Sequence, residues 1–453
     1  MLGQFQMKMI DIQTSLRKST TQVEGLKRDI HRSKLTDKEI NTIDENTPMF
    51  ISVGRMFVLN KKSDVCEQIE NKIKLCENDI KKQEGTKSYL EKQLRECELQ
   101  FKENDGTIFG IGNPLLDISA EVPVSFLEAY NLKANDAILA GSQHKDLNET
   151  ILRDYPNHQF VAGGSTQNSM RAATWILQQP GVCVYTGCVG QDKYHQLLHD
   201  AASKSGLTLA YQIYENPAEH VQTGTCAVLI TGNDRSLVAN LGAANHFTID
   251  HFNDPKNHEH VEKAKIFYTA GFFYTVSPDT VMRLCEHADQ TNKLFCTNLS
   301  APFVCEFFGD RLMKAIPYVD YLFGNETESR SFAKNQLNLD TLDVKEIAKA
   351  LSELPKKNSK RPRVVIITQG ADPTILAIAG QNIQEFPVKK PSKIIDTNGA
   401  GDSFVGGFLA YLALGKSNEE AIQAGAYCAY ECIQQSGCTY PEKPSFDAKT
   451  FVA

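Results

Sequence analysis

The sequence lacks the features that mark membrane, secreted and nucleic-acid-binding proteins. Its longest apolar runs, such as Phe404–Leu414, fall well short of the roughly 20 residues that span a bilayer. No basic region leads into an apolar stretch near the N-terminus, as a secretory signal would require. No cluster of basic residues is dense enough to suggest nucleic-acid binding. We therefore expect a folded, soluble protein of the cytoplasm, or else the nucleus, with neither a membrane nor a nucleic acid as partner.

Paired metal-binding or redox cysteines are also missing. The 12 cysteines run from Cys66 to Cys438 without one pair at Cys-x-x-Cys spacing, and no histidines stand beside them at zinc-finger spacing. We expect reduced thiols that pack as small apolar side chains, which fits a reducing compartment.

Charge density changes about a quarter of the way along the chain. Residues 1–105 carry 19 Lys and Arg against 18 Asp and Glu, whereas the remaining residues carry 29 against 37. About a third of the first segment is therefore charged, against about a fifth of the rest. With 453 residues, 41% of them hydrophobic, the chain has room for two or three domains with a substantial core. We predict domains at 1–105 and 106–453, with the boundary close to Asp105-Gly106.

The first segment contains two runs of residues at heptad spacing. The first run is Phe5, Met9, Ile12, Leu16, Ser19, Val23, Leu26 and Ile30. The second run is Cys66, Ile69, Ile73, Cys76, Ile80, Leu90, Leu94, Cys97 and Phe101, broken only at Gln83 and Lys87. Alternate steps of three and four predict two helices that pack along a shared seam, as in a coiled coil.

The residues between these helices predict a short hairpin. Thr36-Asp37-Lys38-Glu39 has the pattern of a capping box, and Met49–Leu59 suits two short strands that turn near Gly54. We expect coiled-coil arms joined by a β hairpin, the second arm about 60–65 Å long at 1.5 Å per residue. Because the strands would be exposed, we expect the unit to assemble with other subunits.

This segment resembles the beta-class subunits of prefoldin. Leu35–Ile40, Val53–Leu59 and Lys87–Glu91 carry the resemblance, which extends over essentially all of residues 1–103. It implies a hexameric co-chaperone whose coiled-coil tips hold unfolded polypeptides, with other prefoldin subunits as partners. An ordinary coiled-coil oligomeriser is the alternative, and the hairpin sequence argues against it.

From Thr107 onward, short apolar or β-branched runs alternate with helical stretches. The runs are Thr107–Ile111, Val182–Tyr185, Lys265–Thr269, Lys293–Thr297, Tyr318–Phe323 and Val364–Thr368. This alternation predicts an α/β fold with a doubly wound, mainly parallel sheet. Ligands of such folds bind beyond the carboxyl ends of the strands, and the sequence motifs fall there.

The string Asp396-Thr397-Asn398-Gly399-Ala400-Gly401-Asp402 is the most informative of these motifs. It follows an expected apolar strand end at Ile394-Ile395 and precedes an apolar helical run. Backbone N–H groups and the positive end of the helix would point at one place, where an anion can bind. Asp402, in the first helical turn, can reach a hydroxyl that attacks this anion. We predict a phosphoryl-transfer site.

Three further motifs supply polar groups near strand ends. Gly112–Asp117 offers an amide and a carboxylate for two vicinal sugar hydroxyls, and Gly163–Ser169 opens a helix with a glycine pair and a second amide. In Gly324–Glu328 an amide and a carboxylate lie on one face of a starting helix, where Glu328 could hold hydrated Mg²⁺. Turn formation or helix capping is the alternative for each motif taken alone.

An apolar slot suited to a nucleoside base is also predicted. The stretch Arg235–Leu241 fits a strand with Leu237, Ala239 and Leu241 on one face. Leu115, Phe272 and Phe303 would complete the enclosure of a purine, and Phe272 could stack on it. Ordinary core packing is the alternative.

Together these motifs resemble the ribokinase-like carbohydrate kinase family, most closely its adenosine kinases, over about residues 106–445. The ordered matches are Gly112–Ser119, Ala162–Ser169, Thr223–Ala227, Ile230–Asn245, Ala270–Pro278, Asn298–Phe303, Phe323–Glu328 and Asp396–Phe408. There are two departures, Ser403 in place of the usual alanine and His195 in place of a common glycine. Neither affects a proposed catalytic group.

The resemblance implies phosphorylation of the adenosine 5′-hydroxyl by ATP with Mg²⁺, under a small β lid built from about residues 118–160 and 220–245. It makes Asp402 the catalytic base and gives stabilisation of the transferring phosphoryl group to Gly399, Ala400, Gly401 and Arg235. It assigns to the nucleoside Asn113, Leu115, Asp117, Gly163, Gly164, Ser165, Asn168, Cys226, Leu237, Ala239, Leu241, Phe272, Asn298, Phe303 and Asn398. It assigns to ATP Asn325, Thr368, Gly370 and Thr397, and to the metal, through water, Glu328.

Three alternatives to a fused adenosine kinase stay open. One is a related sugar or nucleoside kinase, which the apolar strand and Ala162–Ser169 disfavour. Another is a chaperone subunit that carries the kinase as a passenger, and the third is a pair of separate proteins whose genes were joined. The junction Phe101–Ile108 is too short for a flexible linker. The native mass, about 50 kDa or split between two species, distinguishes the third alternative.

Overall fold

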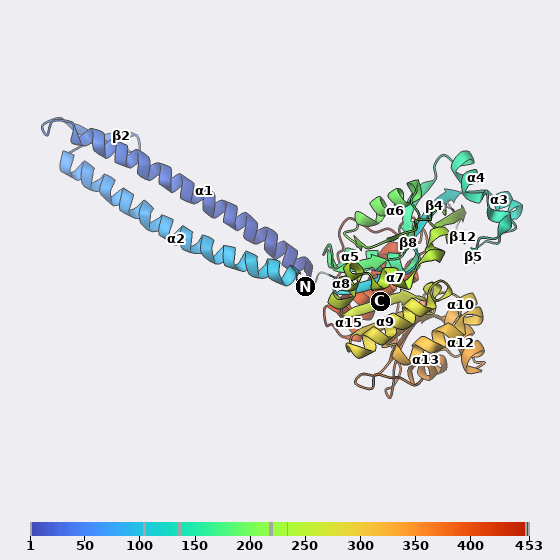
Figure 1. The fold of residues 1–453 in the computed structure, drawn as a ribbon. Helices are drawn as coiled ribbons and strands as arrows, with labels where there is room; N and C mark the ends of the chain where they lie inside the picture. The colour runs from blue at the N-terminus through green and yellow to red at the C-terminus, as the bar shows by residue number, and fades with distance from the viewer. Residues whose placement is uncertain are drawn as a thin grey trace. The chain divides into compact units, whose positions relative to one another are not determined.

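The computed structural model describes residues 2–102, 106–134, 137–216, 221–232, 234–448 and 451; the side chains of residues 2–10, 53 and 95–102 are not among those described. The chain forms two compact units, Met1–Glu103 and Asn104–Ala453. Figure 1 shows both units coloured along the chain. The expected seam side chains of Phe5, Met9, Cys97 and Phe101, and the boundary residue Asp105, lie outside the described part.

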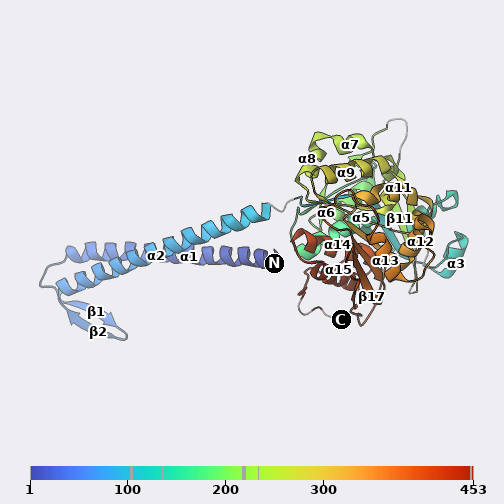
Figure 2. The same cartoon turned by 90° about the horizontal axis from the view of Figure 1, so that it is seen from below.

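The first unit is a pair of long antiparallel helices joined by a hairpin (Figure 2). Helix α1 spans Leu2–Asn41 and α2 spans Lys62–Lys102. The two helices pack along the expected seam, because the described seam residues are buried or half-buried while most of their neighbours are exposed. The predicted coiled-coil arms are confirmed.

The polar residues that interrupt the two heptad runs meet each other. Ser19 is 4% exposed, and its Oγ donates to the side-chain Oε1 of Gln83 at 3.0 Å and to the backbone oxygen of the same residue at 3.2 Å. A buried polar pair of this kind favours one register of the two helices, since a shifted register would leave both groups unpaired.

The hairpin turns where the sequence predicts it. Strands β1 (Met49–Val53) and β2 (Met56–Asn60) pair antiparallel, with Val53 opposite Met56. Gly54 has a φ of +65°, the conformation that a two-residue hairpin loop requires and that glycine adopts without strain. Four large apolar side chains on these strands are more than 60% exposed: Phe50, Met56, Phe57 and Leu59.

The expected capping box at Thr36 is wrong. Helix α1 continues to Asn41, and the Thr36 hydroxyl donates back to the carbonyl of Arg32, one turn earlier. No proline or glycine interrupts the sequence between Leu26 and Asn41, so the helix extends past the capping pattern.

The second unit contains a large, mainly parallel sheet. Neighbouring strands are parallel except for β16–β17 and β17–β18 at one edge. In spatial order the strands are β18 (Gln384–Phe386), β17 (Asp372–Ile378), β16 (Val364–Gln369), β15 (Tyr321–Asn325), β14 (Leu294–Asn298), β13 (Ile266–Ala270), β3 (Ile108–Ile111), β7 (Cys183–Thr186) and β9 (Thr208–Leu209).

Helices cover both faces of this sheet, as a doubly wound fold requires. One face packs its phenylalanines and aliphatic residues under α7 (Ile249–Asn253), α8 (Pro255–Lys263), α9 (Pro278–Gln290), α11 (Gly309–Ala315), α12 (Glu326–Leu337) and α13 (Val344–Ser352). On the other face Tyr321 and Phe323 contact Phe408 of α14 (Ala400–Ala413), which lies between α5 (Ser165–Leu177) and α15 (Asn418–Cys432).

A smaller sheet forms the predicted β lid. Its strands in order are β5 (Ala137–Leu139), β12 (Asp234–Asn240), β11 (Thr225–Thr231), β4 (Leu115–Glu121) and β6 (Gln159–Gly163). One face forms a small core with α3 (Val124–Ala129) and α4 (Leu147–Asp154), where Ile118, Ala227 and Leu229 are fully buried. Alternate residues point the other way, so the second face is free to line a cavity.

The predicted doubly wound, mainly parallel fold is confirmed, with two local differences. The expected strand Tyr318–Phe323 begins at Tyr321, because Ile316–Tyr318 form a 3₁₀ turn. Ile394-Ile395 form no strand; Ile394 is exposed, and the N–H of Ile395 donates to the carbonyl of Ile433. Within the described residues, no helix combines the length and apolar character needed to cross a membrane.

Candidate active site

Two adjoining cavities open at the carboxyl ends of the main-sheet strands, and they meet at Asp402. Each encloses roughly 1000 Å³ including its open mouth, within the range of small-molecule sites. The residues that line both are Ala137, Ser165, Leu237, Phe272, Asn398 and Asp402. A group at Asp402 can therefore act on ligands in either cavity.

The start of α14 supplies the anion-binding groups that the sequence predicts, with one difference. Gly399 has a φ of +76° and turns the chain into the helix. The N–H of Ala400 donates to the carbonyl of Thr397 at 3.3 Å. Among the described residues, the N–H groups of Gly399, Gly401 and Asp402 have no hydrogen-bond acceptor. These three, rather than Ala400, can bind an anion at the positive end of the helix.

Small residues hold α14 close to α5. A Cβ atom on Gly406 would lie 2.3 Å from the carbonyl oxygen of Ser169 and 2.5 Å from the Cβ of Ala172. On the opposite side of α14, a Cβ on Gly407 would lie 2.5 Å from the carbonyl oxygen of Ala424 in α15. Both glycines permit close helix contact, which brings the N-terminal residues of α5 within reach of Asp402.

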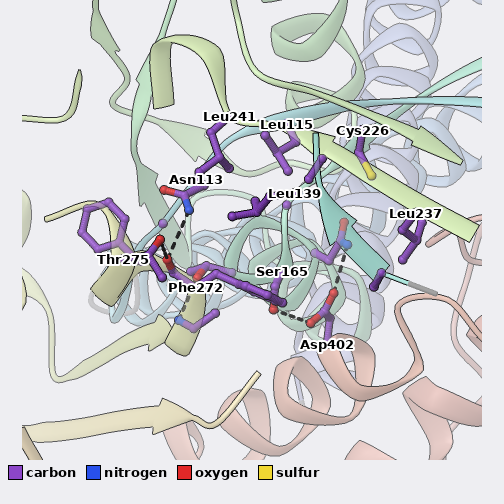
Figure 3. A pocket seen from close by; sticks show the side chains of 18 of the residues that line it. Asn113, Leu115, Leu139, Ser165, Cys226, Leu237, Leu241, Phe272, Thr275 and Asp402 are labelled. Atoms are coloured by element: carbon purple, nitrogen blue, oxygen red, sulfur yellow. Dashed lines mark hydrogen bonds between the residues drawn. The ribbon is translucent and has the colours of Figure 1, made fainter. Parts of the chain in front are cut away.

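Asp402 accepts two hydrogen bonds from α5. Ser165 Oγ donates to its Oδ1 at 2.5 Å, and Asn168 Nδ2 donates to its Oδ2 at 3.1 Å (Figure 3). Burial raises the pKa of Asp402 to about 6, while these two hydrogen bonds act in the opposite direction. The carboxylate is thus oriented, and its pKa lies close to neutral pH, which suits a general base.

The only tryptophan of the chain lies behind this site. Trp175 of α5 stacks on Tyr440, with ring centroids 4.6 Å apart and planes inclined by 18°. The Tyr440 hydroxyl shares a hydrogen bond of 2.7 Å with the hydroxyl of Ser403, the residue after Asp402.

Asp117 lies on the cavity face of the lid sheet. A Cβ on Gly163 would lie 2.0 Å from its Oδ1, so only glycine fits beside this carboxyl group. Burial, with the charge of Cys438 as a smaller cause, raises the pKa of Asp117 to about 8. Nearby, Asn113 is 8% exposed, and its Oδ1 has no hydrogen-bond partner among the described residues. Both groups line the first cavity and can accept hydroxyl hydrogen bonds.

The rest of that cavity wall is apolar. One row across the lid sheet places Asp117 beside Cys226, Cys226 beside Ala239, and Ala239 beside Leu139. Leu115, Leu237 and Leu241 line the same cavity (Figure 3), as do Phe272 and Phe303, whose rings lie 6.0 Å apart. A flat apolar ligand with hydroxyls at one end fits this distribution.

The second cavity holds the proposed ATP and metal residues Asn325, Thr368, Thr397 and Glu328. Glu328 forms a capping box with Asn325, accepting from its backbone N–H at 3.0 Å and from its Nδ2 at 2.8 Å. Burial raises the pKa of Glu328 to about 7. The contacts of Glu328 are therefore those of a helix cap, which the sequence offered as the alternative for this motif.

The lining of the second cavity fits a bound cation. It contains two carboxyl groups, Asp402 and Glu328, and none of its described lining residues is Lys, Arg or His. The negative charge of phosphate groups bound in this cavity would therefore have to be balanced by a cation that the described lining side chains do not supply. A hydrated Mg²⁺ takes few protein ligands besides phosphates and water, so Glu328 is a side chain of this lining that could hold one.

Arg235 lies outside both cavity linings. Its side chain projects from β12 to the carbonyl oxygen of Ile395, at 3.0 Å from Nη2, and to Asp396, whose Oδ2 is 3.5 Å from Nε. In this arrangement it ties the lid sheet to the loop before α14. Its predicted contact with the transferring phosphoryl group stays a prediction.

A profile of the pfkB family of carbohydrate kinases matches residues 125–445. The chain belongs to this family. Adenosine kinase 1 of Arabidopsis thaliana is 48% identical over 345 residues, which cover 76% of this chain and 98% of that protein. The adenosine kinase of Schizosaccharomyces pombe is 43% identical over 74% of this chain and 96% of its own length.

Solved structures of pfkB-type kinases are similar over the same part of the chain. Anopheles gambiae adenosine kinase, in complex with P1,P4-di(adenosine-5) tetraphosphate, has a TM-score of 0.71 and 47% identity, and the match covers 76% of this chain and 99% of that one. Schistosoma mansoni adenosine kinase, in complex with adenosine and AMP, has a TM-score of 0.69 and 33% identity, with the same coverage.

The other unit matches a different family. The profile of prefoldin subunits matches residues 4–104, which include the hairpin and all of the described helix pair except its first two residues. The pfkB-family kinase is therefore fused to a prefoldin-type unit in one chain.

The sequence motifs of this pfkB-family chain did not identify every residue of the site. Ala137, Ile138 and Leu139 of β5 line the first cavity, but the surrounding sequence has no strand pattern that would reveal them. The contact from Ser165 to Asp402 was also unforeseen. Conversely, Asn298 lines the second cavity rather than the first, and Gly163, Ala400 and Gly370 line neither.

Proposed function

We propose that the pfkB-family unit transfers the terminal phosphoryl group of ATP to the 5′-hydroxyl of adenosine, giving AMP and ADP. The observation that carries this proposal is the position of Asp402, a half-buried carboxylate where an apolar cavity with hydroxyl-binding groups meets an anion site. The first cavity accepts the nucleoside, and the second accepts the phosphates.

The residues of the first cavity orient the nucleoside. Asp117 and Asn113 bind the ribose hydroxyls at the end of the cavity nearest the glycine pair, and the apolar lid face covers the base. Asp402 then accepts the proton of the 5′-hydroxyl, held in place by Ser165 and Asn168. Because phosphoryl transfer depends mainly on positioning and charge stabilisation, an oriented carboxylate suffices as the base.

The charge that develops on the phosphoryl group is stabilised at α14. The N–H groups of Gly399, Gly401 and Asp402 donate to its oxygens at the positive end of the helix. We propose that Glu328 holds Mg²⁺ through water. When bound, that ion neutralises phosphate charge, which the lining residues themselves do not.

The test of this function compares the full chain with the variant Asp402→Asn. With adenosine and ATP, we expect kcat to fall at least about 100-fold, the usual contribution of a general base, while nucleoside binding stays within about threefold. The exposed Asp372→Asn serves as the matched control and should keep wild-type turnover. Substantial turnover by the Asp402 variant would refute the assignment.

Substrate competition separates this proposal from the related sugar or nucleoside kinase. Adenosine, other purine and pyrimidine nucleosides, and free ribose are compared by kcat/KM under the same conditions. We expect adenosine to be preferred, because burial of its base in the apolar cavity contributes binding free energy, and free ribose has no base to bury. A preference for ribose would favour the sugar kinase instead.

For the prefoldin-type unit we propose assembly with other prefoldin subunits and binding of unfolded polypeptides. The exposed apolar side chains and unpaired edges of β1 and β2 support the assembly. Affinity purification of the full chain from cells, followed by mass spectrometry, tests it: prefoldin subunits should co-purify at stoichiometric amounts. Purification of a kinase alone would refute the assembly.

We propose that the two parts form one polypeptide of the cytoplasm with a boundary near Asp105-Gly106. The eleven cysteines whose side chains are described are all unpaired, which supports a reducing compartment. Immunoblotting of cell fractions with antibodies against each unit checks both points. A single cytoplasmic band near 50.4 kDa is expected, and two smaller bands would show separate proteins.

A further inference from the structure

A buried arginine lies next to the proposed base and has no part in the steps above. Arg171, in α5, is 8% exposed. Its Nη1 donates to the carbonyl oxygen of Ala162 at 2.6 Å and to Oδ1 of Asn168 at 3.4 Å. Its Nε is buried and has no hydrogen-bond partner among the described residues. A cation that is desolvated and incompletely hydrogen-bonded costs stability, so its position calls for a functional explanation.

The contact with Asn168 determines which end of that amide faces the base. An amide has a donor end and an acceptor end, and an arginine can only donate. With Arg171 at Oδ1, the donor Nδ2 is directed to Asp402. Asp402 alone would select this orientation while it is charged. Once it has accepted the substrate proton, however, the amide could turn unless its other end is held.

Arg171 also contacts the strand that carries the glycine beside Asp117. Ala162 precedes Gly163 and pairs with Leu116 of β4, the residue before Asp117. The positive charge of Arg171 favours the ionised form of the Asp117 carboxyl group and lowers its pKa, against the effect of burial. One guanidinium group thus contacts a neighbour of each carboxylate of the first cavity: Asn168, which donates to Asp402, and Ala162, which pairs with the residue before Asp117.

We propose that Arg171 is a positioning residue for phosphoryl transfer, which keeps Asn168 as a hydrogen-bond donor to Asp402 and so favours the ionised base. The inference rests on the proposed function, since it concerns the base of that reaction. The Arg171 side chain lines neither cavity, and in this proposal it acts on Asp402 through Asn168.

Other titratable groups surround the base and are unchanged in the variants described below. They are Asp117 of β4, Tyr268 of β13, Glu328 of α12, Cys432 of α15 and Cys438 in the segment that follows α15. Because these groups stay the same, a change in the pH dependence of kcat in an Arg171 variant is attributed to the loss of the Arg171 side chain.

The test measures kcat against pH for the full chain carrying Arg171→Met or Arg171→Lys. Methionine removes the charge at similar length, so we expect kcat to fall at least tenfold and the acid limb of the profile to move to higher pH. Lysine keeps the charge but loses the planar fork, so we expect an intermediate kcat with the acid limb near its wild-type position.

A double-variant comparison separates positioning from general damage. If Arg171 acts through Asn168, then Asn168→Ala combined with Arg171→Met should turn over no more slowly than Asn168→Ala alone. The matched control is Arg363→Lys, another buried arginine, which donates to carbonyl groups such as those of Ile316 and Leu354 away from the site. It should lower thermal stability without moving the acid limb.

Three results would overturn the inference. One is a folded Arg171→Met chain whose kcat and acid limb match the wild type. Another is a double variant in which the two losses multiply. The third applies if Arg171→Met does not fold: an Arg171→Lys chain whose kcat equals that of the wild type would then contradict the proposal. A wild-type chain that fails to phosphorylate adenosine would instead refute the proposed function itself.

Discussion

Two glycines at the start of α14 have different physical roles. Gly399 is required by the fold: its φ is +76°, and a Cβ there would lie 2.8 Å from the Cβ of Cys438. Gly401 has neither constraint, because its φ is not positive and a Cβ would meet no atom within 4 Å. Its missing side chain leaves space in the second cavity, where the phosphate is proposed to bind.

Gly401→Ala should therefore impair function without harming the fold. Alanine in a helix is more stable than glycine by roughly 0.5–1 kcal/mol, so the thermal midpoint should stay the same or rise. Because the methyl group would occupy the space beside the anion-binding N–H groups, kcat/KM for ATP should fall about tenfold or more. Steady-state kinetics and calorimetry on the full chain check both parts.

Gly399→Ala is the contrasting variant, which should lower the thermal midpoint of the kinase unit. Wild-type kinetics for the Gly401 variant would show that the phosphate does not approach this residue.

At neutral pH the carboxyl group of Asp117 lowers the folding stability of the nucleoside-free protein. Its pKa is about 8 in the folded state against an ordinary 3.8. Between these values the folded state holds a proton that the unfolded state has released, so stability falls as pH rises through that window. The residue is kept, in our proposal, for ribose binding rather than for stability.

Asp117→Asn should accordingly stabilise the nucleoside-free protein at pH 8 while weakening nucleoside binding. We expect the thermal midpoint of the kinase unit to rise by several degrees at pH 8 and to match the wild type at pH 4, where Asp117 is protonated in the folded state. Binding should weaken by about 1.5–3 kcal/mol for each hydrogen bond to the charged group that is lost. Scanning calorimetry and nucleoside titration provide the measurements, and a lower midpoint at pH 8 would contradict the argument.

At this scale the sequence predicted the residues whose role follows from local spacing. Asp402 and Glu328 lie where a helix start places them, three residues into the first turn. Contacts between distant segments were beyond such reasoning. The hydrogen bond from the Asn168 amide to Asp402, 234 residues away in sequence, follows from no local pattern. Neither does the pairing of Arg235 with Asp396; the predicted roles of Asn168 at the ribose and Arg235 at the phosphate stay predictions.

At the scale of elements, the pair Ser19–Gln83 explains why each heptad run contains a polar position. Considered alone, each polar residue interrupts the apolar run of its helix. Together, Ser19 and Gln83 form hydrogen bonds across the seam. A polar pair in a coiled-coil seam commonly lowers stability while fixing register.

Replacing both members with leucine should stabilise the helix pair, whereas removing one should destabilise it. Ser19→Ala leaves the Gln83 amide without its partner and should cost about 1 kcal/mol or more. The variant Ser19→Leu/Gln83→Leu should unfold at a higher temperature than the wild type. Circular dichroism at 222 nm on the full chain, resolving the transition of the first unit, gives the comparison. A double variant less stable than Ser19→Ala would contradict the expected packing of leucine in the seam.

Elements with strong periodicity were predicted well, and those fixed by tertiary contacts were not. The parallel strands are continuous apolar runs because both faces of the main sheet are covered, so their sequence signal is strong. Strand β5 spans only Ala137–Leu139 and is held by pairing with β12, which no local pattern records. The end of α1 was misplaced because a capping pattern at Thr36 is outweighed by continued helix formation.

At the scale of the whole molecule, the chain joins an enzyme to a unit whose apolar surface is uncovered. A two-stranded hairpin is marginal by itself, and further pairing or packing would stabilise it. Phe57 is the most exposed of its large side chains, at 75%. Assembly with other prefoldin subunits through this hairpin, as proposed above, would attach the kinase unit to a larger particle.

Phe57→Lys should therefore reduce assembly and leave catalysis unchanged. The added charge would be buried without a partner in any packed interface, which is strongly unfavourable. Light scattering coupled to size-exclusion chromatography, with prefoldin subunits present, should show the variant shifted to smaller species at equal kcat. Tyr89→Lys is the control, since Tyr89 is 61% exposed on α2, away from the hairpin. Equal assembly of both variants would exclude the hairpin as the interface.

The tryptophan behind the active site gives the chain an internal optical probe. Because Trp175 is the only tryptophan, emission excited at 295 nm comes entirely from one indole stacked on Tyr440. That tyrosine is joined by a hydrogen bond to Ser403, the residue after Asp402. Any ligand that moves the start of α14 therefore changes the surroundings of the single fluorophore, so nucleoside binding can be followed in the unlabelled, full-length fusion.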